Sequence, residues 1–307
     1  MSHRPLVSVG VPVYNEEAFV RQTLDSLLAQ DYDNLEVVIS DNASTDSTPV
    51  ICEDIVKKDS RVRYFRAETN QGAIKNFNAA FHHSKGKYFM WAGAHDLWEP
   101  TFISQAVGLL ESDPSVILCY PETMLIDTAG QRVMKVPDEM DTREMSSVRR
   151  YLKFISKVHW CNMIHGLIRS EAIKSSSMLR SVWGPDILLL AELSLRGEFA
   201  QIPEVLFYRR ENRPGDHQKS DAESAKRYVK TLEGSGNENL EMPAPDLRRG
   251  LRDAVLKVVK ESDLAFPTKL YAHIKTVVCY RVRYGVSFPG EFLVLNIMRV
   301  THSLKEH

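Results

Sequence analysis

Apolar runs of strand length alternate with amphipathic segments through the first hundred residues. The runs cover 6–13, 35–40 and 87–91, and uninterrupted runs of this kind are typical of strands buried on both faces of a sheet. Between the first two runs, apolar residues from Phe19 to Leu28 recur at helical spacing and Asn15 is a suitable N-cap, which predicts a helix over 16–30. Because parallel pairing requires such a crossover, we expect the first two strands to be parallel neighbours.

The same rhythm continues after the second strand. A polar loop at 41–48 leads into a helix through 53–58, and then come a short strand at 61–65, a turn at 70–72 and a helix at 73–83. This βαβαβαβ order predicts an α/β doubly wound half with a nucleotide-sized crevice outside the carboxyl ends of its strands.

Polar side chains gather at those predicted strand ends. The run at 87–91 passes through Gly93 and Ala94, which remove side-chain bulk, into His95 and Asp96. Asp41 follows the second strand at the equivalent place, where a carboxylate can accept hydrogen bonds from a base or a ribose. We interpret these residues as the edge of an active site. The alternative is that ordinary polar loop residues end each strand.

The second half of the chain is less regular. Its pattern predicts a helix at 101–112, strands at 117–120 and 124–127, and a closing strand at 201–210. The charged stretch 138–150 is mixed in sign and indicates a solvated loop and helix, although its Arg149-Arg150 pair could meet phosphate.

The character changes after residue 218. A helix at 221–232 is followed by flexible breaks at 233–237 and 243–245, and the remainder to 306 reads as helical. We therefore expect a main domain at 1–218, a linker with a helix at 219–245 and a C-terminal helical region at 246–307. That last region alternates basic with apolar residues. We expect it to dock on the main domain; the alternatives are a homodimer contact and a peripheral contact with an anionic membrane.

Composition narrows the class of protein. The 307 residues are 43% hydrophobic and 26% charged, as in soluble globular proteins. Lys and Arg total 39 against 40 Asp and Glu, so no overall field attracts nucleic acid. The four cysteines are isolated, and no run approaches the ~18 apolar residues of a membrane-spanning helix. We expect a reduced, cytoplasmic chain, either free or peripheral at the inner face of a membrane.

Four motifs in order carry a family resemblance. They are Pro12-Val13-Tyr14-Asn15-Glu16, Ser40 to Thr48, Asn70-Gln71-Gly72 with Asn76, and Gly86-Lys87-Tyr88-Phe89. Each is weak alone, but the series resembles the signatures of family 2 glycosyltransferases over residues 5–215. The resemblance implies a GT-A fold, which is a Rossmann-like, mixed mostly parallel sheet flanked by helices. It also implies a nucleotide-diphosphate sugar donor, a saccharide or lipid-linked acceptor, inversion at the anomeric carbon, and a role in polysaccharide or glycoconjugate biosynthesis.

The resemblance also assigns residues to the two substrates. The positions that it places on the nucleotide sugar are Pro12, Tyr14, Glu16, Asp41, Asn70, Gly72, Asn76, Ala94, His95, Asp96 and Arg210. The positions that it places on the acceptor side are Trp160, His165, Gly166 and Trp183. For His165 a purely structural role is an equal alternative.

The metal motif departs from the family pattern. An Asp-x-Asp pair commonly ends the strand at 87–91, but here Gly93 stands at the first Asp and His95 at the second, with Asp96 at a further acidic position. Histidine binds Mn²⁺ well, whereas Mg²⁺ prefers oxygen. The resemblance therefore implies a divalent metal, Mn²⁺ or Mg²⁺, held by Asp96 and His95. His217 would add a metal contact from the segment after the closing strand, where a solvated basic loop is the alternative.

Asp186 is the candidate catalytic base. It matches the acid of the family's Glu-Asp pair, whose Glu is replaced here by Pro185. One correctly placed carboxylate is enough to take the acceptor hydroxyl proton. The structural alternative is that Asp186 only complements the dipole of a helix that begins at Pro185. Two other functions stay open: a degenerate protein that binds a nucleotide sugar without transferring it, and a nucleotidyltransferase, which the lack of a glycine-rich phosphate loop after the first strand disfavours.

Overall fold

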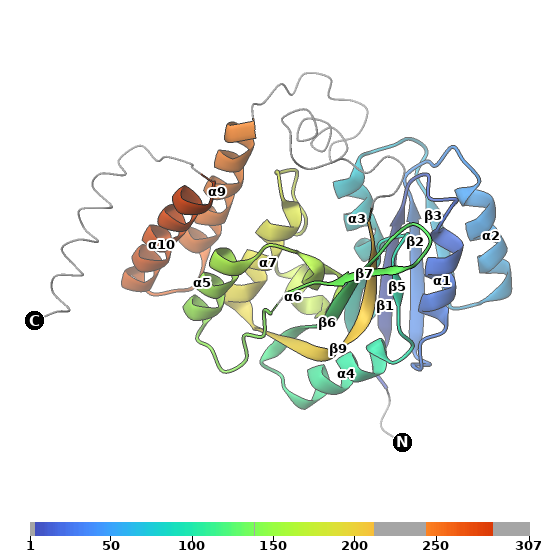
Figure 1. The fold of residues 1–307 in the computed structure, drawn as a ribbon, viewed down its shortest axis with the longest axis horizontal. Helices are drawn as coiled ribbons and strands as arrows, with labels where there is room; N and C mark the ends of the chain where they lie inside the picture. Colours follow the sequence, from blue (N-terminus) through green and yellow to red (C-terminus); the bar gives the residue numbers. More distant parts are fainter. Residues whose placement is uncertain (1–3, 138, 212–243, 285–307) are drawn as a thin grey trace, which may run out of the picture.

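One sheet organises the part of the chain that the structure, a computed structural model, describes: residues 4–137, 139–211 and 244–284 (Figure 1). Its strands are β1 Val7–Val13, β2 Leu35–Asp41, β3 Val62–Arg66, β4 Tyr88–Trp91, β5 Leu97–Trp98, β6 Val116–Ile126, β7 Arg132–Lys135, β8 Leu167–Arg169 and β9 Glu198–Arg210. The helices are α1 Val20–Leu28, α2 Thr48–Lys58, α3 Ala73–His82, α4 Phe102–Ser112, α5 Ser147–Lys157, α6 Ser170–Lys174, α7 Pro185–Arg196, α9 Ala244–Glu261 and α10 Phe266–Tyr284, with a 3₁₀ turn, η1, at Asn162–His165.

The sheet is mixed and mostly parallel, as the family resemblance implies. The strand order is β3-β2-β1-β4-β8-β6-β9-β5, and β7 pairs with β6. Strands β3, β2, β1 and β4 are parallel, β8 pairs antiparallel with both β4 and β6, and β9 is parallel to β6. Strands β6 and β9 therefore run in the direction of β1. Because β2 and β4 are each parallel to β1, the carboxyl ends of these three strands share one edge.

Alternate residues of each strand pack on opposite faces of the sheet. Tyr88 and Met90 of β4 belong to the apolar cluster that includes α1 and α4, whereas Phe89 and Trp91 belong to the cluster that includes α5 and α7. Both faces are thus covered, which explains why the strand sequences are continuously apolar. Gly10 is needed in β1 because an added Cβ would lie 2.5 Å from the ring of Phe89.

Several element boundaries differ from those expected from the sequence. Helix α1 begins at Val20 rather than at 16, and Asn15 does not cap it: its backbone has a φ of 54° and its side chain bonds the next loop instead. The two short strands expected at 117–120 and 124–127 are one long strand, β6, with register shifts at Pro121 and Glu122. Proline cannot donate to a ladder, so a bulge accommodates it.

The charged stretch before α5 is not simply solvated. Arg150 is buried, and its guanidinium donates to the carbonyls of Ser194 and Met145 at 2.9 and 2.7 Å. The bond to Ser194 ties α5 to the end of α7, and the bond to Met145 fixes the segment before α5. Arg150 is therefore a structural residue rather than a phosphate contact.

The helices α9 and α10 dock on the main body, which is the first of the three arrangements that the sequence pattern predicts. Leu251 and Val255 of α9 and Tyr280 of α10 belong to the same apolar cluster as α5 and α7. The Tyr151 hydroxyl of α5 lies 2.7 Å from that of Thr276 in α10. The predicted linker helix at 221–232 and His217 lie outside the described residues, and the proposed domain boundaries stay predictions. Among the helices described, none is long and apolar enough to span a membrane.

Candidate active site

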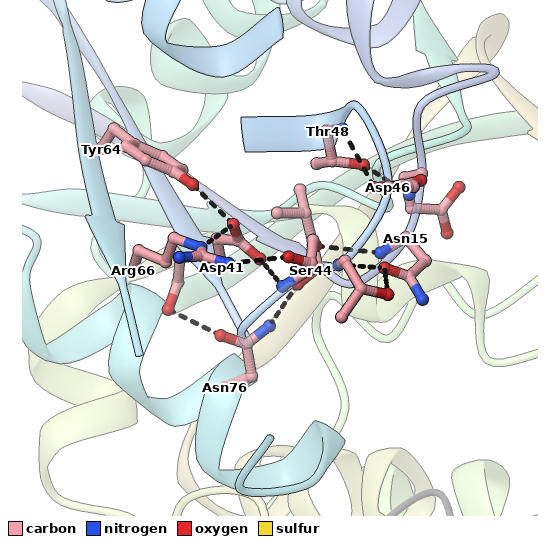
Figure 2. A network of polar contacts seen from close by, with 12 residues as sticks. Asn15, Asp41, Ser44, Asp46, Thr48, Tyr64, Arg66 and Asn76 are labelled. Carbon is pink, nitrogen blue, oxygen red and sulfur yellow. Dashed lines mark hydrogen bonds and ion pairs between the residues drawn. The ribbon is translucent and has the colours of Figure 1, made fainter. Parts of the chain in front are cut away.

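Asp41 lies at the carboxyl end of β2 and is held from three sides. The backbone N–H of Ser44 donates to Oδ1 at 2.8 Å, the hydroxyl of Tyr64 donates to Oδ2 at 2.5 Å, and Nε of Arg66 lies 3.3 Å from Oδ2 (Figure 2). Asp41 as a whole residue is 1% exposed. A carboxylate offers about four acceptor positions, but the Asp41 side chain is fully buried, so a ligand reaches it only if a neighbour such as the 47% exposed Arg66 side chain moves.

Burial and the contact with Asp41 together raise the pKa of the neighbouring Tyr64. Burial raises the pKa of the Tyr64 hydroxyl, and the hydrogen bond to Asp41 raises that pKa further. Tyr64 is therefore protonated at any physiological pH and acts as a fixed donor. Burial also raises the pKa of the Cys52 thiol, on the same face of the sheet, to about 12, which keeps that thiol neutral.

The loops after β1 and β2 are joined by their own polar side chains. The N–H of Asn15 donates to Ser44 Oγ at 3.0 Å, and Asn15 Oδ1 accepts the N–H of Thr45 at 2.8 Å. The N–H of Glu16 donates to Thr48 Oγ1 at 2.8 Å (Figure 2 labels this threonine). These bonds fix the left-handed backbone of Asn15, where a non-glycine residue would otherwise be strained. Tyr14, between β1 and this loop, is 44% exposed.

The turn at 70–72 and helix α3 complete this half of the edge. Asn70 Oδ1 accepts the N–H of Gly72, whose φ of 86° favours glycine. Asn76, near the start of α3, is buried: its Oδ1 accepts the hydroxyl of Ser40, and its Nδ2 donates to the carbonyl of Val13. Both asparagines thus brace the strand ends. Direct contacts from them to a ligand remain predictions.

At Pro12, β1 is still paired with β2 but no longer with β4. The pairing of β1 with β4 ends at Gly10 and Trp91, while the pairing with β2 continues to Val13. The missing N–H of a proline is tolerated at such a place. The chain can therefore turn out of the sheet here towards Tyr14 and Glu16.

The end of β4 brings an imidazole and two carboxylates together. Glu16 Oε1 lies 3.0 Å from His95 Nδ1, and His95 Nε2 lies 3.9 Å from Asp96 Oδ2. Because a carboxylate oxygen accepts, Nδ1 carries the proton in a neutral ring and Nε2 is left unprotonated on the side of Asp96. Asp96 Oδ1 accepts the backbone N–H of Arg210 at 2.8 Å. This arrangement links β1, β4 and β9 at one point.

Only a glycine fits at position 93, beside this pair. A Cβ added at Gly93 would lie 2.5 Å from Asp96 Oδ2 and 3.3 Å from His95 Nε2. His95 Nε2 and Asp96 Oδ2 are two of the ligands that a divalent ion would need, and its other ligands would come from a phosphate and water. The hydrogen bond from His95 to Glu16 matches the way in which metal-binding histidines are oriented. Within the described residues, no group of three or more His, Cys, Asp or Glu side chains could hold a metal by itself.

Arg210 is buried, and its guanidinium donates to backbone carbonyls. Its Nε donates to the carbonyl of His95 at 2.9 Å, and its Nη1 donates to those of Asp127 and Thr128 at 2.9 and 3.0 Å. The guanidinium also lies over the ring of Phe19 at 4.7 Å. Arg210 therefore holds the loop that carries His95 in place, and a direct contact with a nucleotide sugar stays a prediction.

His165 lies close to the same end of β4. Its Nδ1 is 2.9 Å from the carbonyl of Trp91 and its ring packs against Phe207. Burial lowers the pKa of His165, while nearby Asp96 acts in the opposite direction. The neighbouring Gly166 has a packing role, since an added Cβ would lie 2.6 Å from the carbonyl of Cys119.

The two tryptophans predicted on the acceptor side differ in place. Trp160 is half-buried before η1, with the guanidinium of Arg209 5.7 Å from its ring. Arg209 in turn donates to Asn162 Oδ1 at 2.9 Å. Trp183 is half-buried against the cluster of α7 and α9. Only Trp160 is thereby connected to the segment that leads to His165.

Asp186 lies in the first turn of α7, after Gly184 in the left-handed conformation and Pro185. It is partly exposed. In the described part of the chain its one hydrogen bond is the N–H of Ile187 to Oδ1 at 3.0 Å. The segment before it is fixed to α3, because Asn78 Nδ2 donates to the carbonyl of Leu179 at 2.9 Å. Structure and sequence thus agree on a carboxylate at a helix start, and its role in catalysis stays a prediction.

The sequence reading missed the partners of Asp41. Tyr64 and Arg66 are two apart on β3, and Arg66 is directly opposite Asp41 in the parallel register. The signal was present, since residues two apart in a strand share a face. Only the register showed that this face meets Asp41.

Comparison with known proteins adds the family. Residues 8–164 match the model of glycosyl transferase family 2. An uncharacterized glycosyltransferase of Rickettsia typhi is 30% identical over 165 residues, which are 53% of this chain and 51% of that protein. An uncharacterized glycosyltransferase of Haemophilus influenzae is 34% identical over 116 residues, 38% of this chain and 36% of that protein. The chain thus spans about half the length, or less, of these curated relatives.

Two solved structures share the fold. TarS of Staphylococcus aureus, in complex with UDP-GlcNAc, has a TM-score of 0.66 at 18% identity over 91% of this chain and 73% of that chain. The mannosyltransferase PcManGT of Pyrobaculum calidifontis, in complex with GDP-Man and Mn²⁺, has a TM-score of 0.55 at 17% identity over 100% of this chain and 82% of that chain.

Proposed function

Since the chain belongs to glycosyl transferase family 2, and is therefore a glycosyltransferase, we propose that it moves a sugar from a nucleoside-diphosphate donor to an acceptor hydroxyl with inversion. A role in building a polysaccharide or glycoconjugate is part of the proposal. Nucleotide-sugar complexes of two proteins with the same fold support the donor class.

One observation carries the proposal: an unbroken series of contacts along the sheet edge. Asp41 bonds Ser44, Ser44 bonds Asn15, and the next residue, Glu16, meets His95 beside Asp96. The residues come from the ends of β1, β2 and β4. An open α/β sheet binds nucleotides at this edge.

The donor would occupy this edge in two parts. Asp41 would accept a hydrogen bond from a base or ribose once the half-exposed Arg66 beside it moves, and the exposed ring of Tyr14 offers a stacking face nearby. The diphosphate would lie towards His95 and Asp96. A nucleotide held at both ends would keep its sugar at a fixed distance from the acceptor.

A divalent metal fits the end of β4. His95 and Asp96 would hold it, and Glu16 would keep the His95 ring oriented with Nε2 as acceptor. When bound, such a metal stabilises negative charge on a leaving diphosphate. The imidazole favours Mn²⁺ over Mg²⁺.

Asp186 would act as the base. A carboxylate with one local hydrogen bond retains acceptor positions for an acceptor hydroxyl. Removal of that proton as the hydroxyl attacks the anomeric carbon completes an inverting transfer, because the proton passes to Asp186 while the bond to the diphosphate breaks.

The test is Asp186→Asn, measured by donor hydrolysis and transfer with Mn²⁺ and a panel of nucleotide sugars. Loss of a general base should lower kcat by about 10²- to 10⁴-fold, while nucleotide affinity stays as in wild type. Asp25→Asn, an exposed change on α1, is the matched control. Turnover equal to wild type would remove Asp186 from the reaction.

Three substitutions favour a second candidate function, a protein that binds a nucleotide sugar without transferring it. Gly93, His95 and Pro185 replace residues that the family commonly uses. Calorimetric titration of the same panel separates the two. Tight binding with no product for any acceptor, in the presence of Mn²⁺, would favour this second candidate.

A further inference from the structure

Helix α10 has two apolar faces, of which one is buried. Ala272, Thr276 and Tyr280 are buried, and Ala272 and Tyr280 belong to the apolar cluster of α5 and α7. The thiol of Cys279 donates to the carbonyl of Ile155 on α5 at 3.2 Å. This side accounts for how α10 attaches to the domain.

The side opposite Thr276 carries a second apolar set. At about 100° per residue, its members lie within roughly 120° of one another around the helix. They are Leu270, Tyr271, Ile274, Val278 and Val282. Leu270 is 47% exposed, Tyr271 49% and Val282 82%, whereas Ile274 and Val278 are half-buried. We call this set the α10 row.

The row lies among basic residues. The sequence of α10 contains Lys and Arg but no Asp or Glu, and the same is true of its neighbour α5. Exposed cations on the two helices are Arg149, Lys157 and Arg281. Two adjoining helices without a carboxylate are unusual in a chain with 40 acidic residues. Figure 1 places α5 and α10 at the end of the molecule opposite α2.

We propose that this end of the protein lies on an anionic membrane surface, with the α10 row inserted among the headgroups. A helix of this kind lies in the interface when an apolar face is bordered by Lys and Arg. The lipid headgroups supply the negative charge that α5 and α10 lack. A second copy of the chain suits this face less well, because a two-fold contact would place the same cations against each other.

The proposal does not depend on the reaction. The α10 row shares no residue with the sheet edge that carries Glu16, Asp41 and Asp96. Membrane contact would, however, bring a lipid-linked acceptor to the surface on which the enzyme already sits. Failure of either proposal therefore leaves the other intact.

The experiment is flotation of the full chain with vesicles of phosphatidylcholine containing about 30 mol% phosphatidylglycerol, against pure phosphatidylcholine, at about 0.1 M salt. The wild type should float with the anionic vesicles only. The variant Leu270→Ser, Tyr271→Ser, Val282→Ser should reduce the partition coefficient about tenfold or more. Lys275→Glu with Arg281→Glu should reduce it about fivefold or more for each charge.

Matched controls separate the face from general surface changes. Val50→Ser with Val133→Ser removes exposed valines elsewhere, and Lys57→Glu with Lys174→Glu reverses exposed charges elsewhere. Both should float as wild type, and circular dichroism should show that every variant is folded. A wild type that does not float, or an α10-row variant that floats equally, overturns the proposal. A wild-type dimer that the α10-row variant converts to monomer, with no flotation, would assign the face to a second copy.

Discussion

Asp41, at the end of β2, and Asp186, in the first turn of α7, are both carboxylates, but their surroundings differ. Asp41 is buried and holds Ser44, Tyr64 and Arg66, whereas Asp186 is partly exposed and bonds its own neighbour Ile187. A carboxylate whose acceptor positions are mostly taken is suited to fixing a ligand in one orientation. One with open positions is suited to receiving a proton.

The comparison extends to the regions around the two residues. The loops after β1 and β2 are joined by side-chain bonds from Asn15, Ser44 and Thr48. The segment before α7 is fixed through Asn78 to α3, and by the bond of Ser177 to Glu192. The proposed donor edge is therefore braced by its own side chains, whereas the position of the proposed base, Asp186, depends on where a helix begins.

Gly93→Ala is the change expected to have the largest effect on this comparison. The new Cβ would lie 2.5 Å from Asp96 Oδ2, so the carboxylate must shift. A displacement of about 1 Å at a reacting centre can cost about 10²-fold in kcat. Steady-state kinetics on the full chain measures it, and Mn²⁺ titration by electron paramagnetic resonance should show weaker binding. Gly108→Ala lies on α4 with open space around the added methyl group and serves as a control for the loss of a glycine. Unaltered kinetics in Gly93→Ala would show that the position of Asp96 is unimportant.

Asp41→Asn should mainly affect folding and affinity. The amide loses acceptor capacity towards Tyr64 and Arg66, and bonds to a buried charge are worth about 1.5–3 kcal/mol, so we expect a decrease of about 2 kcal/mol in the free energy of unfolding. Urea denaturation measures this decrease. Asp186→Asn should change that free energy by less than about 0.5 kcal/mol. If the two substitutions destabilise the protein equally, the contrast between the two regions is wrong.

His165 gives a smaller, pH-dependent effect. Burial lowers its pKa in the folded protein below 6.5, so the folded state binds fewer protons than the unfolded state as the pH falls. The stabilising contribution is therefore complete above the unfolded value and is lost as the pH decreases through the folded one. His165→Gln should lose less stability than wild type between pH 7.5 and 5.5, by about 1 kcal/mol or less. Thermal unfolding at the two pH values measures the difference. His82→Gln, at an exposed position, should behave as wild type, and an identical response of His165→Gln would contradict the prediction.

The sequence by itself determined the alternation of strands and helices in the first hundred residues. Apolar runs buried on both faces leave little choice of structure, and a helical crossover enforces parallel pairing. The placement of Asp41, His95 and Asp96 at strand ends followed from the same pattern. The resemblance to family 2 glycosyltransferases rested on these local motifs, and the family is confirmed.

Tertiary structure alone decided the contacts between distant segments. Glu16 and His95 are separated by 79 positions, and Asp96 and Arg210 by 114, so no local pattern relates them. Asn15 is a residue type that often caps helices, but its side chain accepts the N–H of Thr45 in the adjoining loop instead. Arg150 looked solvated in a charged stretch, yet its guanidinium satisfies carbonyls at the end of α7. A polar side chain bonds whichever partner the packed chain brings near, and only the arrangement of strands and helices in space specifies that partner.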